Sequence, residues 1–492
     1  MNLVLLNARL PGNDDLVNVE IADGRIRQIG FIDPPELLLS TATDVIDLGE
    51  RWLIPGLWDN HVHFSQWAQT ARRLDVTRAQ SAAEVVELVA ERVPHVPAGE
   101  TLVGFGFRDG LWRDAPSRPQ IDAVSGDMPV VLVSGDLHCC WLNSAALALH
   151  GYPEHPTGLL REDDCFTVVQ AIGTVADAVL DEWADEAARR AATRGVVGIV
   201  DLEMAWNLEV WKRRMSTGLD SLRVEFGIYT EHLTRAIDAG LRTGDVIPGT
   251  DGLLSVGPYK VLTDGSLNTR TAYCVDEYPG LEGQPNSRGM LTVPPEELLT
   301  RLRLAVGAGI RPTVHAIGDL ANTLALDAFE TLGCEGSIEH AQLLALSDVP
   351  RFAALGVVAS VQPAHALDDR DIAEHHWAGR TDRAFMLASL LASGAQLAFG
   401  SDAPVSPLDP WVTMAAAVGR TQDGREPWHL EQAITRQAAL AASSRGRHIV
   451  AVGETADLAV CEIDPYTASV PDLRTMPVAA TLIAGRFTHN TL

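Results

Sequence analysis

Short apolar runs alternate with helical stretches over residues 195–445, and this alternation restricts the fold of the chain more than any other feature. Seven runs of this segment have the length and composition of buried strands. An eighth run, residues 52–64, lies upstream of them. Strands separated by helices form parallel sheets, and eight such units suit a closed barrel. The pattern therefore predicts an α/β fold, a (β/α)8 TIM barrel over residues 55–445.

Both ends of the chain differ from this central segment. Residues 1–54 contain short runs in which apolar and polar residues alternate, and Asp23-Gly24 is a typical hairpin turn. Residues 446–492 show the same alternation. Two β-rich pieces at opposite ends of the chain suggest one composite β-sandwich domain built from both.

A long interval, residues 64–194, separates the first barrel strand from the second. A plain strand-to-helix connection has only a few residues. The interval contains its own strand candidates, at 101–107 and 129–136, together with helical stretches. We therefore interpret this interval as an insertion with an α+β fold.

The charge of the chain narrows the range of partners. Its 65 acidic and 38 basic residues give a net charge of −27, which repels nucleic acid and anionic membranes. The sequence has no apolar stretch long enough to span a bilayer, and its six cysteines contain no C-x-x-C pair. We expect a reduced, cytoplasmic protein with a small-molecule substrate, without nucleic acid or membrane as partner. A homodimer is compatible with the sequence, since closed dimers are the commonest oligomers.

Several polar residues stand where the predicted barrel strands end. His61 and His63 are two residues apart, so both face the same side of a strand. His315, His340 and Asp402 each end a later apolar run. Active sites of these barrels are built at the carboxyl ends of the strands, and imidazole is a good ligand for zinc. A single histidine there is easily explained by packing, whereas five such residues predict a metal site.

Lys260 lies inside an apolar run, YKVL, where an unpaired charge is costly. One explanation is an ion pair with Asp264. The other is a reaction with CO₂ that turns the lysine into an anionic carbamate, which can bridge two metal ions.

The order of H-x-H, Lys, His, His and Asp along the chain resembles the amidohydrolase superfamily. The segments VHAIGDLAN, IEHAQL and LAFGSDAPV resemble its YtcJ-like branch, which includes N-substituted formamide deformylases. The resemblance implies one or two divalent ions per chain, zinc first among them. It implies the ligands His61, His63, Lys260, His315, His340 and Asp402. Carboxylated Lys260 would bridge the ions, and Asp402 would also transfer the proton.

The resemblance also implies hydrolysis of an amide-type carbon–nitrogen bond, in an N-acyl or N-formyl amine, by metal-activated hydroxide. Three further residues are candidates for substrate binding: His138 in the insertion, and Gln362 and His365 after the seventh strand. Two alternatives stay open. A cyclic amidase of the hydantoinase or dihydroorotase sort shares these ligands, and some proteins of this fold are non-catalytic.

Overall fold

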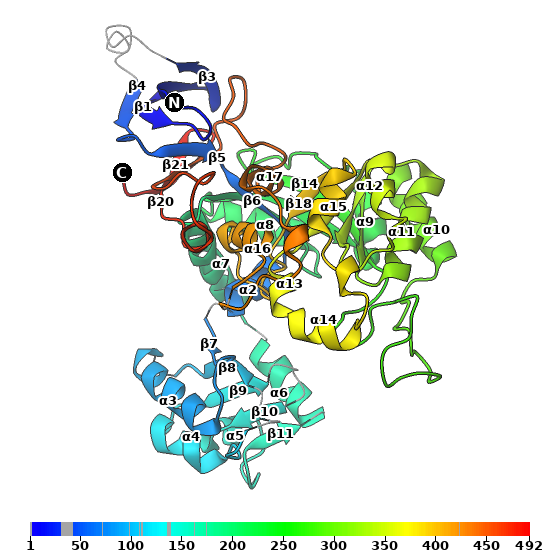
Figure 1. Ribbon diagram of the computed structural model, residues 1–492. Coiled ribbons are helices and arrows are strands. Elements are labelled where there is room, and N and C mark those ends of the chain that lie inside the picture. Colours follow the sequence, from blue (N-terminus) through cyan, green and yellow to red (C-terminus); the bar gives the residue numbers. More distant parts are fainter. Residues whose placement is uncertain are drawn as a thin grey trace. The chain divides into compact units, whose positions relative to one another are not determined.

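The computed structural model describes residues 2–30, 43–70, 72–97, 99–107, 109, 112–134, 139–161, 163–173, 175–422 and 424–492. The chain divides into two compact units (Figure 1). One consists of Met1–Trp67 and Asp185–Leu492, and it contains the barrel and a terminal sheet. The other is Ala68–Ala184, with a sheet of its own.

Eight parallel strands form the barrel, which confirms the predicted fold class. All six residues of its second strand are buried, as expected for parallel strands that are covered on both faces. The barrel strands are, in spatial order, β6 (Leu57–Val62), β12 (Val196–Asp201), β13 (Arg223–Tyr229), β14 (Leu254–Leu262), β15 (Pro312–Ala316), β16 (Gly336–His340), β17 (Val357–Val361) and β18 (Leu397–Phe399).

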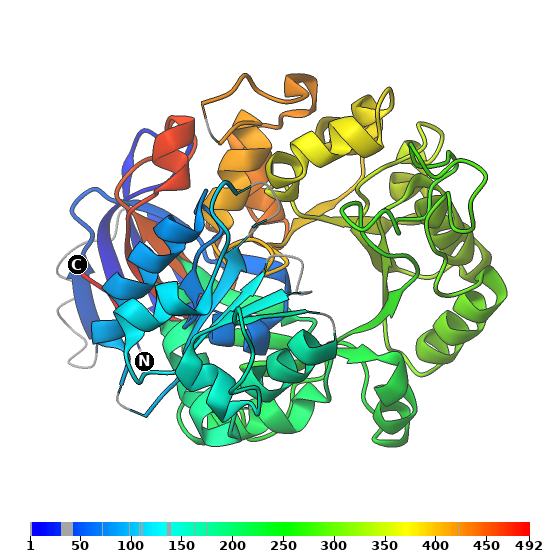
Figure 2. The same cartoon turned by 90° about the horizontal axis from the view of Figure 1, so that it is seen from below.

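Helices follow the barrel strands, and those between residues 295 and 355, green to yellow, lie outside the strands (Figure 2). No helix among the described residues has both the length and the hydropathy that a membrane crossing requires. The helices of this part are α2 (Phe64–Thr70), α7 (Asp177–Ala192), α8 (Asn207–Ser216), α9 (Thr230–Asp238), α10 (Pro295–Gly307), α11 (Asp319–Leu332), α12 (Val349–Leu355), α13 (His365–Asp368), α14 (Arg370–His376), α15 (Leu387–Ala392), α16 (Pro410–Gly419), α17 (Arg436–Ala442) and α18 (Val470–Arg474).

The two ends of the chain together build the terminal sheet. Its strands pair in the order β21-β20-β19-β5-β1-β2-β3, and β4 pairs with β1. Leu5, Ile21, Val460 and Leu482 share its buried core. The strands are β1 (Asn2–Arg9), β2 (Leu16–Ala22), β3 (Arg25–Gly30), β4 (Thr43–Asp47), β5 (Trp52–Pro55), β19 (Leu458–Cys461), β20 (Val478–Ile483) and β21 (Arg486–Asn490).

The run of residues 52–64, predicted as the first barrel strand, contributes one strand to each of two sheets. Its first part, β5, pairs with β19 of the terminal sheet, and β6 pairs with β12 of the barrel. Gly56 separates them at a point where a Cβ atom would lie 2.4 Å from the Val197 side chain. Glycine therefore allows the chain to pass from one sheet to the other in close contact with the barrel.

The unit Ala68–Ala184 has a five-stranded sheet in the order β11-β10-β9-β8-β7. Asn143, in the loop before its helix α5, accepts a hydrogen bond from the amide of Ala146 and so caps that helix. The elements are β7 (Leu74–Asp75), β8 (Leu102–Phe107), β9 (Val130–Ser134), β10 (Cys139–Leu142), β11 (Leu159–Arg161), α3 (Ala82–Arg92), α4 (Arg118–Ser125), α5 (Ser144–Leu149) and α6 (Asp163–Gly173).

Candidate metal centre

The barrel closes where the last strand meets the first, and this closure brings together three of the predicted ligands. The amide of Asp402 donates to the carbonyl of His61 at 2.7 Å, and the amide of His63 donates to the carbonyl of Ala403 at 2.8 Å. A Cβ atom on Gly400 would lie 2.6 Å from Cβ of His61. The missing side chain at position 400 therefore allows β18 to approach β6 closely.

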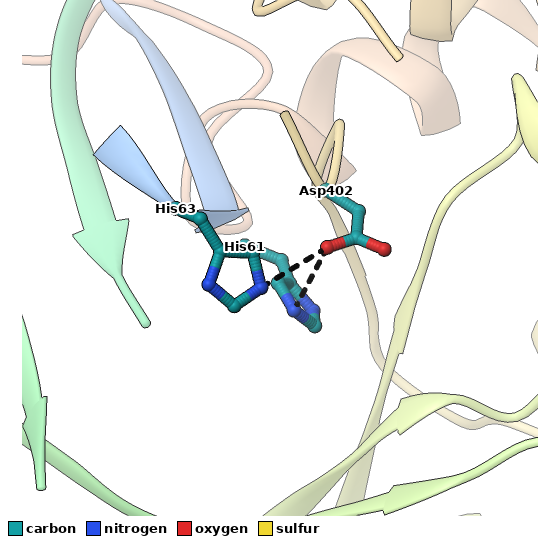
Figure 3. A group of neighbouring side chains, drawn as sticks. All are labelled: His61, His63 and Asp402. Carbon is teal, nitrogen blue, oxygen red and sulfur yellow. Dashed lines mark ion pairs between the residues drawn. The ribbon is translucent and has the colours of Figure 1, made fainter. Parts of the chain in front are cut away.

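The side chains of His61, His63 and Asp402 point toward one another (Figure 3). Nε2 of His61 and Nε2 of His63 each lie 3.4 Å from Oδ1 of Asp402. Ligand atoms bound at about 2.1 Å to one tetrahedral ion are about 3.4 Å apart. The three atoms therefore fit the coordination sphere of a single divalent ion.

Two of the predicted ligands have an unfavourable backbone conformation. His340 has a φ of 72° and Asp402 a φ of 57°, and Ala341 follows with 40°. Residues with a Cβ atom seldom adopt this left-handed region, and such strain is concentrated at functional sites. The strain at these two strand ends supports a functional role for both residues.

The other two histidines lie beside this group. The ring of His340 is 5.1 Å from that of His61 and 4.5 Å from that of His315, measured between centroids. Nε2 of His315 lies 3.3 Å from the carbonyl oxygen of Gly265. Nδ1 of His340 is buried and has no hydrogen-bond partner in the part of the chain that the structure describes. An unpaired buried nitrogen is costly unless a further ligand satisfies it.

Lys260 lies on β14, and its side chain is buried. Its Nζ atom has no hydrogen-bond partner within the described ranges. Burial lowers the pKa of this amine, although the charges of Glu339 and Asp402 act in the opposite direction. Lys260 is also one of only two lysines in the sequence, the other being Lys212. Nearly all the basic side chains of the protein are arginines, but this buried position has a lysine amine.

The alternative that Lys260 pairs with Asp264 is wrong. Asp264 lies beyond the end of β14, and its carboxylate accepts hydrogen bonds from the backbone amides of Tyr273, Ile317 and Gly318. It also lies 3.5 Å from Nε2 of His315. Asp264 therefore supports the loop that follows β15. The Lys260 amine instead lies near His61 and His315: burial lowers the pKa of both imidazoles, and the charge of the amine lowers it further.

Glu339 is a part of the site that the sequence reasoning missed. Its carboxylate lies 2.7 Å from Nδ1 of His61 and accepts hydrogen bonds from Ser360 and Thr313 at 2.6 Å. Burial raises the pKa of Glu339, but the charges of His61 and Lys260 and the hydrogen bonds outweigh it, and the pKa is lowered to about 2. An acidic residue inside the buried run SIEH was the available signal.

The contact with Glu339 determines how His61 presents its ring. A carboxylate beside Nδ1 accepts a hydrogen bond from the N–H of that nitrogen, which leaves Nε2 free to bind a metal. Nε2 is also the atom that faces Asp402. The side-chain amide of Gln362, a predicted substrate-binding residue, lies 3.3 Å from the same Nδ1. Gln362 therefore lies beside the site, in contact with a candidate ligand.

Two further residues were predicted to bind substrate. His365 is the first residue of α13, and its ring is stacked on His340 with 6.1 Å between centroids. Ligand atoms of His340, His365 and Asp402 lie within 4.8 Å of one another, as do those of the first group. His138 lies outside the described residues. The substrate-binding roles stay predictions.

Comparison with known proteins decides the family. The amidohydrolase family model matches residues 44–489. The chain belongs to the amidohydrolase family. It is a hydrolase of carbon–nitrogen bonds, as the sequence motifs predicted.

Three relatives of this amidohydrolase match 84–98% of its length. It is 29% identical over 451 residues to Protein LONG AFTER FAR-RED 3 of Arabidopsis thaliana. That alignment covers 84% of this chain and 76% of the Arabidopsis protein. It is 24% identical to "Putative amidohydrolase YtcJ" of Bacillus subtilis (strain 168), in an alignment that covers 96% of this chain and 95% of that protein. An N-substituted formamide deformylase of Arthrobacter pascens is 24% identical, in an alignment that covers 98% of this chain and 97% of that protein. These matches confirm the resemblance to the YtcJ-like branch.

A solved structure confirms the fold. An uncharacterized metal-dependent hydrolase from Pyrococcus horikoshii superposes with a TM-score of 0.78 at 24% identity. The alignment covers 96% of this chain and 99% of that one.

Replacement of Glu339 by glutamine tests the contact with His61. We expect Glu339→Gln to bind zinc about 10–100-fold more weakly, because His61 loses the partner that orients its ring. Competition against a chromogenic chelator measures this affinity. Asp457→Asn is the matched control, since that buried carboxylate lies just before β19 and pairs with Arg223, the first residue of β13, at 2.7 Å. Equal zinc affinity in the Glu339→Gln variant and the wild type would rule out the orienting role.

Proposed function

We propose that this amidohydrolase hydrolyses an N-acyl or N-formyl amine with zinc bound at the carboxyl ends of the barrel strands. The observation that carries the proposal is the group of His61, His63 and Asp402, whose facing atoms are spaced as ligands of one ion. The choice of an acyclic amide is supported by the relative from Arthrobacter pascens, which matches over almost its full length.

The residues present fit one ion, with a second position beside it. His61, His63 and Asp402 would hold the first ion. His315 and His340 would hold the second, and Lys260 would contribute a ligand to both. Lys260 would react with CO₂ to form a carbamate, in which a new N–C bond forms and one proton is released. This reaction would also remove the cost of burying a cation.

A bound zinc ion would lower the pKa of water toward about 7 and polarise the substrate carbonyl. The chain itself supplies the proton transfer. Burial raises the pKa of the Asp402 carboxyl, but His61 and His63 hold it well below its usual range. Asp402 is therefore ionised and can take a proton from the attacking water, then deliver it to the leaving nitrogen.

Metal analysis tests the proposal first. After expression with zinc, we expect one to two zinc ions per chain by elemental analysis, two if Lys260 is carboxylated. Exhaustive chelation should reduce turnover of an N-formyl amine to background, and added zinc should restore it, because without the ion the attacking water would keep its high pKa. Full turnover by metal-free protein would contradict the proposal.

The cyclic amidases are the second candidate, since they share the proposed ligands. A panel of N-formyl amines, N-acyl amines and hydantoins separates the two. We expect the larger kcat/KM for the acyclic compounds. A clear preference for hydantoins would replace the first proposal with the second while leaving the metal site unchanged.

A further inference from the structure

Strand β10 of the inserted unit, which lies between β9 and the edge strand β11, carries two adjacent cysteines that face opposite sides of its sheet. Successive side chains of a strand alternate between the two faces. Cys139 packs in the cluster that contains Val85 and Val89 of α3. Cys140 packs in the other cluster, together with Cys165 of α6. Only one cysteine of the adjacent pair therefore faces α6.

Cys140 and Cys165 are in unusually close contact. Their Sγ atoms lie 2.6 Å apart, and both side chains are fully buried. Non-bonded carbon atoms attract each other best at about 3.5–4.0 Å, and sulfur is larger than carbon. A disulfide bond is about 2.05 Å long. The two sulfur atoms thus lie well inside the distance of an ordinary contact between thiols, at a separation from which a small movement forms the bond.

The packing around Cys140 and Cys165 favours closer approach of the two sulfur atoms over their separation. Val133, Leu142 and Leu160 pack around the pair, and all three are buried. Cys140 lies opposite Val133 of β9 and Leu160 of β11, so its backbone is held from both sides. The tight packing of protein interiors leaves little room for a sulfur atom to retreat.

We propose that Cys140 and Cys165 form a disulfide bond that links β10 to α6 under oxidising conditions. With glutathione disulfide as oxidant, one thiolate attacks a sulfur of the oxidant and releases one glutathione thiol. The second thiolate then displaces the other glutathione, so that two protein thiols are oxidised and one oxidant disulfide is reduced. Burial raises the pKa of the Cys140 thiol, so the reaction is slow in the folded protein.

Mass spectrometry of the full chain tests the proposal. The protein is incubated with glutathione disulfide, denatured without reductant and treated with N-ethylmaleimide. We expect the number of alkylated cysteines to fall from six to four, and peptide mapping to recover Cys140 linked to Cys165. We also expect a higher melting temperature for the oxidised protein, reversed by dithiothreitol, because the bond restricts the unfolded chain.

The neighbouring cysteine provides the matched control. Cys139→Ala should still lose two alkylatable thiols on oxidation, whereas Cys140→Ala should lose none. Mapping of the wild-type protein decides the question even if a variant folds poorly. Six alkylatable cysteines after oxidation, or a bond from Cys165 to Cys139, would overturn the proposal.

Discussion

Asp402→Asn is expected to reduce turnover by about 10²–10⁴-fold, the usual contribution of a positioned acid–base group. Asparagine has nearly the same shape and can keep the contacts to His61 and His63, but its amide cannot take up a proton. We therefore expect the variant to fold normally and to retain zinc. Steady-state kinetics with an N-formyl amine, together with elemental analysis, separates loss of proton transfer from loss of metal.

Asp409→Asn is a matched control for the Asp402 variant. Asp409 is also a largely buried carboxylate after β18, but it caps α16 and pairs with Arg194 at 2.8 Å. Its replacement should lower the melting temperature and leave kcat near the wild-type value. If Asp402→Asn also turned over at the wild-type rate with its zinc retained, the acid–base role of Asp402 would be wrong.

Lys260→Ala is expected to produce the second large effect. If Lys260 carries the carbamate, its removal should reduce the zinc content from two ions per chain to one. A metal ion contributes several kcal/mol of transition-state stabilisation, so turnover should fall by at least about 10²-fold. Added acetate or propionate should restore part of it, because a small carboxylate can occupy the vacated space and bridge the ions.

The small number of lysines makes the carbamate directly observable. Protein equilibrated with ¹³C-labelled bicarbonate should show one carbamate signal from a side chain by ¹³C NMR. The signal should survive in Lys212→Ala, since that lysine is on the protein surface beside Glu209, and disappear in Lys260→Ala. A zinc content and turnover unchanged in Lys260→Ala would mean that the amine has no part in the metal site.

The barrel could be predicted because its strands are buried on both faces and its helices are amphipathic, so the two alternate visibly along the chain. The residue at which 52–64 divides between two sheets could not, because both β5 and β6 are buried and follow each other almost directly. Only the steric requirement at Gly56, which depends on contact with Val197, marks the division.

The candidate site was predictable to the extent that its residues end apolar runs. His61, His63 and Asp402 all do so, and the structure brings their facing atoms together. Glu339 was missed because it lies before the histidine that ends its strand, and its partner His61 is distant in sequence. His365 was predicted, but its stacking on His340 depends on how α13 follows β17 and has no local sequence signal.

The terminal sheet also determines the order in which the protein can assemble during synthesis. Strands β1 to β5 leave the ribosome first, yet β5 lies between β1 and β19, which is made some 400 residues later. Until then one edge of β5 has unpaired amides and carbonyls, and exposed strand edges invite pairing with other chains. The nascent chain must therefore carry an incomplete sheet through synthesis of the whole barrel, and β19 to β21 complete that sheet only after the barrel strands have been translated.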